Sequence, residues 1–190
     1  MKVINILSHH PQEIISEYRD PNEYIKRFPD TDFILLSTPP HWVGFFINDW
    51  HHKWGSQIKK EDSTIEMECW RPYGNGIKQV YEKNIDGICH KVFPSRKVKI
   101  KKFGEILTSK EMLKNLELEM KKGHELIIHF YGSHESLVTW LLMNIKKNET
   151  TRIVVQHLGG WFSWFNWQYK RNIFKLIPYF FEKKMLKNID

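Results

Sequence analysis

Leu126-Ile-Ile-His-Phe-Tyr-Gly-Ser-His134 opens the stretch of sequence that decides the fold. Its first six residues are apolar and rich in β-formers, which predicts a buried strand over Leu126–Tyr131. Apolar residues at helical spacing follow over Glu135–Lys146, and Arg152-Ile-Val-Val-Gln156 predicts a second strand. Two buried strands joined by one helix are typical of a right-handed βαβ unit, in which the strands run parallel.

Polar residues follow the ends of both strands in this stretch. Parallel strands end on the same edge of a sheet, and open α/β sheets bind their ligands at that edge. Gly132, Gly159 and Gly160 would let a ligand approach the backbone closely. We therefore expect the polar residues of the two strand ends to converge on one site. They are His129, Ser133, His134, Gln156 and His157.

The rest of the chain alternates strand and helix signals in the same way. The predicted strands are Lys2–Ser8, Asp32–Ser37, Thr64–Trp70 and Gly87–Phe93. The predicted helices are Phe45–Lys60, the helix that Ser109 caps and that runs to Lys122, and Gln168–Lys187. Arg71–Gly76 has turn chemistry. The basic run Ser95–Lys102 is of a kind that is usually a solvated surface and only sometimes a phosphate-binding patch. This alternation predicts an α/β fold with a Rossmann-like, doubly wound, mainly parallel sheet and helices on both faces.

Composition limits the class of protein and of partner. The 190 residues predict one domain with a sizeable core, and the formal net charge of +7 suits an anionic partner: nucleic acid, an acidic membrane surface or a phosphorylated ligand. Cys69 and Cys89 are too few for a disulfide framework and indicate a reducing compartment. No apolar run approaches the ~20 residues that cross a bilayer, and the N-terminus lacks a signal-peptide pattern, so we expect a cytoplasmic protein.

The histidines do not have the spacing of a metal site. The chain contains neither His-Glu-x-x-His nor Cys-x-x-Cys, and the adjacent pairs His9-His10 and His51-His52 should point apart. We expect these histidines on the surface and in loops. The glycine patterns of dinucleotide-binding and P-loop proteins are absent as well. Neither a metal nor a bound cofactor is therefore expected.

Three strand ends together resemble a known family. Ser37-Thr-Pro-Pro-His-Trp-Val-Gly44 precedes a helix N-terminus, which favours an anion, and Ile128–Gly132 and Val155–Gly160 are the other two strand ends. The three segments resemble the N-terminal, acceptor-side domain of GT-B glycosyltransferases, in the large retaining group that uses nucleotide sugars (family 4). In that family the first loop lies near the donor phosphates, and the last segment carries a histidine beside the transferred sugar.

The resemblance implies the roles of the site residues. His157 matches the histidine beside the sugar and would be catalytic, with no metal and with a nucleotide sugar as co-substrate. Acceptor and donor contacts would come from His41, Trp42, Gly44, His129, Gly132, Ser133, His134, Gln156, Gly159 and Gly160. One departure from the family is Val43-Gly44, which stands where Gly-Gly is usual.

The resemblance also implies what surrounds the domain. Residues 1–190 would form one acceptor-side domain, truncated before its last strand and inactive alone, because the family's donor-binding domain is absent. The acceptor would be a lipid-linked glycan or a polysaccharide. Two interpretations of the aromatic segment Gln168–Lys187 are open. In the first, Lys170 and Arg171 contact the inner face of an anionic membrane. In the second, the segment is a helix whose aromatic face packs in the core. Nucleic acid is not expected as a partner under this interpretation.

A second interpretation stays open beside the first. A basic Rossmann-like module could bind nucleic acid or a phosphorylated ligand without catalysis, since the net charge suits either partner.

Overall fold

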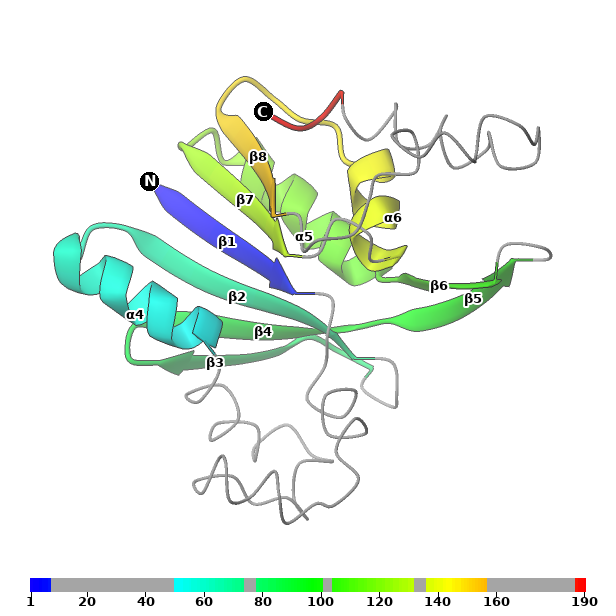
Figure 1. Cartoon of the computed structure of the whole chain (residues 1–190), viewed down its shortest axis with the longest axis horizontal. Coiled ribbons are helices and arrows are strands. Elements are labelled where there is room, and N and C mark those ends of the chain that lie inside the picture. The colour runs from blue at the N-terminus through cyan, green and yellow to red at the C-terminus, as the bar shows by residue number, and fades with distance from the viewer. Residues whose placement is uncertain (8–49, 74–77, 101–103, 132–135, 157–186) are drawn as a thin grey trace, which may run out of the picture.

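The computed structural model of the chain describes residues 1–7, 50–73, 78–100, 104–131, 136–156 and 187–190 (Figure 1). Two predicted elements, the strand Asp32–Ser37 and the helix Gln168–Lys187, lie outside these residues. The described part is an α/β structure with one large, mostly parallel sheet, three helices and a separate two-stranded ribbon. The predicted α/β class is confirmed at this level.

The large sheet has six strands in the order β3-β4-β2-β1-β7-β8. Every neighbouring pair is parallel except β3 and β4, which are antiparallel. The predicted parallel arrangement of β1, β7 and β8 is therefore confirmed. The strands are β1 (Lys2–Leu7), β2 (Glu66–Tyr73), β3 (Tyr81–Ile85), β4 (Ile88–Pro94), β7 (Leu126–Tyr131) and β8 (Thr151–Gln156).

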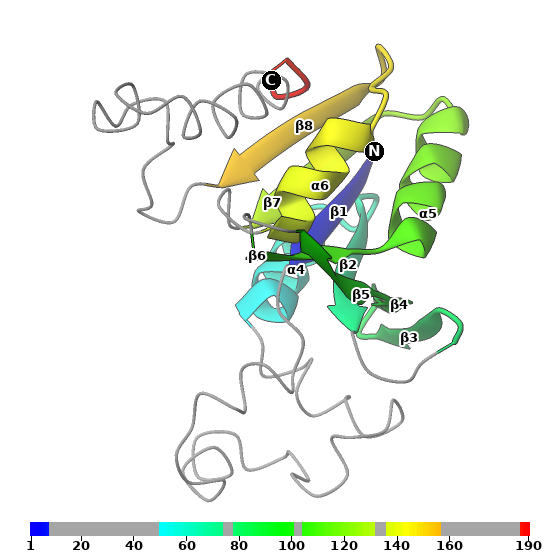
Figure 2. The same cartoon turned by 90° about the vertical axis from the view of Figure 1, so that its right-hand side faces the viewer.

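The three helices pack on the sheet through two apolar clusters. Side chains on successive strand residues point to opposite faces, so Ile4 and Ile6 face one way and Val3 and Leu7 the other. The larger cluster joins Ile4 and Ile6 to α5 (Lys110–Lys121) and α6 (Ser136–Asn144). The smaller cluster contains Val3 and Leu7, and Ile58 of α4 (Trp50–Glu61) packs against it. Figure 2 shows α5 and α6 on the side of the sheet that faces the viewer.

Ser109 begins α5 as the sequence predicts. Its side chain accepts a hydrogen bond from the backbone N–H of Met112 at 3.3 Å, which satisfies a donor of the first turn. Its hydroxyl also donates to the carbonyl of Pro94 at 2.7 Å. The helix ends at Lys121, and Gly123 follows with a φ of +70°, a conformation that glycine adopts without strain. The cap thus fixes both the start of α5 and its position against β4.

Three features of the sheet were not predicted. Strand β2 continues through Arg71, which is buried, to Tyr73 instead of turning. The pairing of β1 with β2 stops at Trp70, so Pro72 pairs only with β4 and its missing N–H costs no ladder bond to β1. Strand β3 forms a hairpin with β4 through Asp86 and Gly87, both at positive φ.

The third unpredicted feature is the ribbon of β5 (Arg96–Ile100) and β6 (Gly104–Thr108). These strands pair with each other in antiparallel fashion as a sheet of their own. The basic run that contains β5 was expected as a solvated surface, with a phosphate-binding patch as the rarer alternative, and not as a strand. Its four residues Arg96–Lys99 are exposed, so that part of the expectation is correct, but they form a strand.

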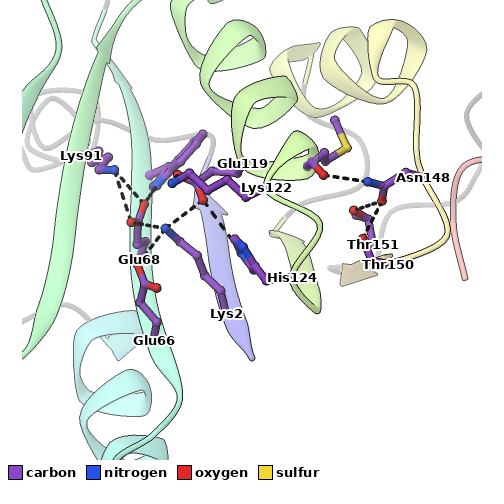
Figure 3. Close-up of polar contacts among 12 residues, drawn as sticks. Lys2, Glu66, Glu68, Lys91, Glu119, Lys122, His124, Asn148, Thr150 and Thr151 are labelled. Atoms are coloured by element: carbon purple, nitrogen blue, oxygen red, sulfur yellow. Dashed lines mark hydrogen bonds and ion pairs between the residues drawn. The ribbon is translucent and has the colours of Figure 1, made fainter.

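A buried ion network ties the amino ends of β1 and β2 to α5 (Figure 3). Lys2 is 3% exposed, and its Nζ lies 2.8 Å from Glu66, 2.7 Å from Glu68 and 3.1 Å from Glu119. Glu119 also pairs with Lys122 at 2.7 Å. Glu66 and Glu68 belong to β2 and Glu119 belongs to α5, so the ammonium of Lys2 on β1 holds two strands and a helix together.

Lys91 and Trp70 complete the network around Glu68. Lys91 Nζ lies 3.2 Å from one oxygen of Glu68, and the indole N–H of Trp70 donates to the same oxygen at 2.5 Å. Glu68 is 3% exposed, so both contacts offset the cost of removing its charge from water.

The network shifts the pKa values of its members. The hydrogen bond from Lys2 lowers the pKa of Glu66. Burial would raise the pKa of Glu119, but the hydrogen bonds from Lys122 and Lys2 outweigh it and hold that pKa below its usual value. Burial opposes the charge of Lys2 too, yet its bonds to Glu66 and Glu68 raise its pKa above the usual value.

No helix in the described part of the chain is long and apolar enough to cross a membrane.

We expect Lys2→Met to lower the free energy of unfolding by about 3 kcal/mol at pH 7, because it leaves Glu68 and Glu119 buried without their shared cation. The folded-state pKa values of Glu66 and Glu119 are lowered, so their stabilisation is present above the unfolded pKa and is lost as pH falls through the folded pKa. Urea denaturation between pH 7 and pH 3 should therefore show a smaller acid-induced loss in the variant than in the wild type. Lys121→Met, at an exposed position on α5, is the control and should behave like the wild type. Equal acid-induced losses in all three proteins would contradict this role of Lys2.

Candidate functional site

The structure describes two of the residues expected at the site, His129 and Gln156. The other nine lie outside the described residues. They are His41, Trp42, Gly44, Gly132, Ser133, His134, His157, Gly159 and Gly160.

His129 and Gln156 lie on neighbouring strands and on one face of the sheet. Gln156 is the last residue of β8 and pairs in register with Tyr131, the last residue of β7. His129 lies two residues earlier on β7, on the face that Tyr131 shares. It is thus about 6.6 Å from the end of its strand. Gln156 is exposed and His129 is half-buried.

His129 is hydrogen-bonded to Asn5 of the neighbouring strand β1. Its Nδ1 lies 3.0 Å from the Oδ1 of Asn5, and the two residues are paired in the β1–β7 register. Burial lowers the pKa of His129, so the ring is neutral at pH 7. A neutral ring that donates its Nδ1–H to Asn5 carries its lone pair on Nε2. The pair therefore presents a proton acceptor at the centre of the sheet.

Asn5 also has an unused donor. Its side chain is 1% exposed, and its Nδ2 has no hydrogen-bond partner among the residues that the structure describes. A buried N–H without a partner costs about 1–3 kcal/mol, which marks the position as one that packing alone does not explain. The sequence carries a signal for this position, because Asn5 interrupts an otherwise apolar run.

Asn5 and His129 belong to a row of chemically active side chains that crosses four strands. Asn5 pairs in register with His129 on one side and with Cys69 on the other, and Cys69 pairs with His90 of β4. Cys69 and His90 are both fully buried. The row lies on the face that α4 covers, where an ordinary α/β protein would place apolar residues.

The first turns of α4 cover this row with three more aromatic or imidazole rings. The Nδ1 of His52 lies 2.9 Å from the Nε2 of His90, and its Nε2 lies 3.3 Å from a carboxylate oxygen of Asp86. The ring of His51 meets the ring of Tyr131 edge-on at 4.9 Å, and Trp54 lies 5.8 Å from His129. We call Asn5, His51, His52, His90, His129 and Tyr131 the histidine layer.

The contact with Asp86 fixes how the two histidines share their protons. A carboxylate only accepts, so the Nε2–H of His52 donates to Asp86. In the neutral ring the Nδ1 of His52 then accepts from the Nε2–H of His90. This chain of bonds links α4 to β4 and to the β3–β4 turn, and it holds the first turn of α4 over the row.

The burial of His51 and His52 corrects the sequence analysis. Both were expected at the surface, but they are 2% and 3% exposed. They do point apart as expected, since His51 contacts β7 and His52 contacts β4. Their burial depends on where α4 crosses the sheet, and no local pattern contains that information.

Among the described residues, no group of three or more histidine, cysteine or acidic side chains could hold a metal ion. In the described part of the chain, Cys69 and Cys89 are not joined by a disulfide. Hydrogen bonding and proton transfer are the chemistry that the described residues of the layer can provide.

Comparison of the chain with protein-family models, with curated proteins and with solved structures finds no match. Function must therefore be inferred from the chemistry of the site.

We expect Asn5→Asp to move the pKa of His129 from below the usual value for histidine to above it, because a carboxylate beside Nδ1 stabilises the protonated ring. The pKa is read from an NMR titration of the imidazole carbon resonances. Asn5→Leu removes the acceptor and serves as the control, and it should leave the pKa low. A pKa of His129 that is the same in the wild type and the Asp variant would show that the two side chains are not in contact.

Proposed function

We propose that the chain is a Rossmann-like, doubly wound domain. The five parallel strands of its described part follow one another in the chain as β1, β2, β4, β7 and β8. Across the sheet their order is third, second, first, fourth, fifth, which matches the first five strands of the Rossmann order. The packing of α4 in one cluster and of α5 and α6 in the other supports helices on both faces.

This strand order directs attention to one place in the sheet. The chain moves outward from β1 to β4 on one side and then continues with β7 on the other side of β1. Ligands of open α/β sheets bind where the strand order reverses, at the carboxyl ends of the strands. Asn5 and His129 lie on the two strands that flank this point. The neutral His129 bonded to Asn5 is the observation that carries the functional proposal.

Within this fold the chain acts as the acceptor-side domain of a glycosyltransferase that uses a nucleotide sugar. A sugar hydroxyl needs a proton acceptor at the moment of transfer; the Nε2 of His129 can accept, and the buried Asn5 holds the ring in the tautomer that leaves the lone pair on Nε2. An aromatic ring provides the flat apolar surface on which a sugar ring rests. Trp54 is 41% exposed and lies beside His129, so it fits that role.

The remaining parts of the proposal come from the family resemblance. His157 is the catalytic residue beside the transferred sugar, and the nucleotide of the donor binds to a second domain. The acceptor is lipid-linked or a polysaccharide, and the protein acts in the cytoplasm with peripheral contact to an anionic membrane. Residues 1–190 by themselves transfer no sugar, because the resemblance covers only the acceptor-side domain of the family.

We expect Trp54→Ala and His129→Ala each to weaken glycan binding by about tenfold or more, the loss of one good contact of ~1.4 kcal/mol. Binding is measured by saturation-transfer NMR and by titration with oligosaccharides and their lipid-linked forms. Leu118→Ala, at an exposed apolar position on α5, is the matched control and should bind like the wild type. If glycans bind equally well to all four proteins, or to none of them, the acceptor site is not where we propose it.

A non-catalytic module for polyanions is the second candidate function. The observation in its favour is the exposed basic strand β5, which carries Arg96, Lys97 and Lys99. A salt titration of binding separates the two functions. Binding of a neutral oligosaccharide should change little as salt rises, whereas binding of a polyanion weakens steeply.

A further inference from the structure

The β5–β6 ribbon stands apart from the main sheet. It continues from the carboxyl end of β4 and extends away from the six-stranded sheet (Figure 1). Its register pairs Arg96 with Thr108, Lys97 with Leu107 and Lys99 with Glu105. A two-stranded antiparallel ribbon of this kind is narrow and has two faces.

Three cations of β5 are exposed on those two faces. Side chains alternate along a strand, so Arg96 lies on one face and Lys97 and Lys99 lie on the other. All three are exposed, and none of them forms an ion pair with a side chain that the structure describes. Val98, between them, is 37% exposed. The ribbon therefore offers positive charge on both sides, and Val98 is the exposed apolar side chain among those that the structure describes there.

The base of the ribbon is held firmly by hydrogen bonds. The backbone N–H of Leu107 donates to the hydroxyl of Ser136 at 2.9 Å, and the hydroxyl of Thr108 donates to the carbonyl of Arg96 at 3.3 Å. Ser109 bonds to Pro94 at the same end. Charges on an element that is already ordered cost less entropy when a partner binds.

We propose that the ribbon docks in the major groove of duplex DNA. The groove is about 12 Å wide and admits a two-stranded ribbon, with phosphates along both walls. Cations on both faces of the ribbon fit such a groove, whereas a flat membrane surface would meet one face only. The deep, narrow major groove of double-stranded RNA excludes the ribbon. The net charge of +7 assists the encounter.

This inference rests on the second candidate function, the polyanion module, and names its ligand. It is independent of the proposed glycosyltransferase, because it uses no residue of the histidine layer, and either proposal can fail without the other. It differs from the expectation, implied by the family resemblance, that nucleic acid is not a partner.

Fluorescence anisotropy with a labelled, mixed-sequence duplex DNA tests the proposal. Three phosphate contacts give a slope of about −2.7 in log K against log salt, so wild-type affinity should fall by about 40-fold or more between 50 and 200 mM salt. The variant Arg96→Gln/Lys97→Gln/Lys99→Gln should bind at least tenfold more weakly at 50 mM and show a slope flatter by about 2.7. Circular dichroism checks that the triple variant is folded. If it is not, the single variant Lys99→Gln takes its place, and its slope should be flatter than that of the wild type by about 0.9.

The matched control is Lys60→Gln/Lys83→Gln/Lys121→Gln, which removes the same charge from exposed positions on α4, β3 and α5. It should keep the wild-type slope. Equal losses in the two triple variants would reduce the effect to net charge and overturn the proposal. So would binding to single-stranded DNA or double-stranded RNA as tight as to duplex DNA, or β5-dependent binding to anionic phospholipid vesicles without binding to the duplex.

Discussion

The buried ammonium of Lys2 is the interaction on which the rest of the structure depends. It stands at the first residue of the central strand β1 and contacts acidic side chains from β2 and α5. A cation removed from water is tolerated only when carboxylates surround it, so the positions of β1, β2 and α5 are fixed together. This network lies at the amino ends of the strands. Their carboxyl ends need no such charges for stability and can hold polar groups for another purpose.

The histidine layer is the part of the fold that stability does not explain. Apolar side chains in place of Asn5, His52, His90 and His129 would cover the sheet under α4 without buried polar atoms. The protein instead builds a chain of hydrogen bonds through His52, and within the described part of the chain the Nδ2 of Asn5 has no partner. Groups that cost stability and converge beside the point where strand order reverses are typical of a ligand site.

Much of the fold could be predicted from local patterns. The apolar runs of β1, β7 and β8 and the cap at Ser109 are signals that each segment carries by itself, and the structure confirms them. The extension of β2 through Pro72 could not be predicted, because it depends on where β1 ends. The β5–β6 ribbon was missed because alternating lysines resemble any solvated surface. In the site, His129 was expected near a strand end, but its partner Asn5 and the burial of His51 and His52 depend on register and on the path of α4.

The central claim is that Asn5 and His129 form a ligand site at the centre of the sheet. The most direct measurement follows the ring resonances of His129 and Trp54 in a ¹⁵N-labelled protein while a mixture of oligosaccharides is added. If the Nε2 of His129 accepts from a bound sugar that rests on Trp54, the ring resonances of both residues should shift and saturate together. If these resonances stay unchanged while saturating shifts appear elsewhere in the protein, the site lies in another place and this account of the histidine layer is wrong.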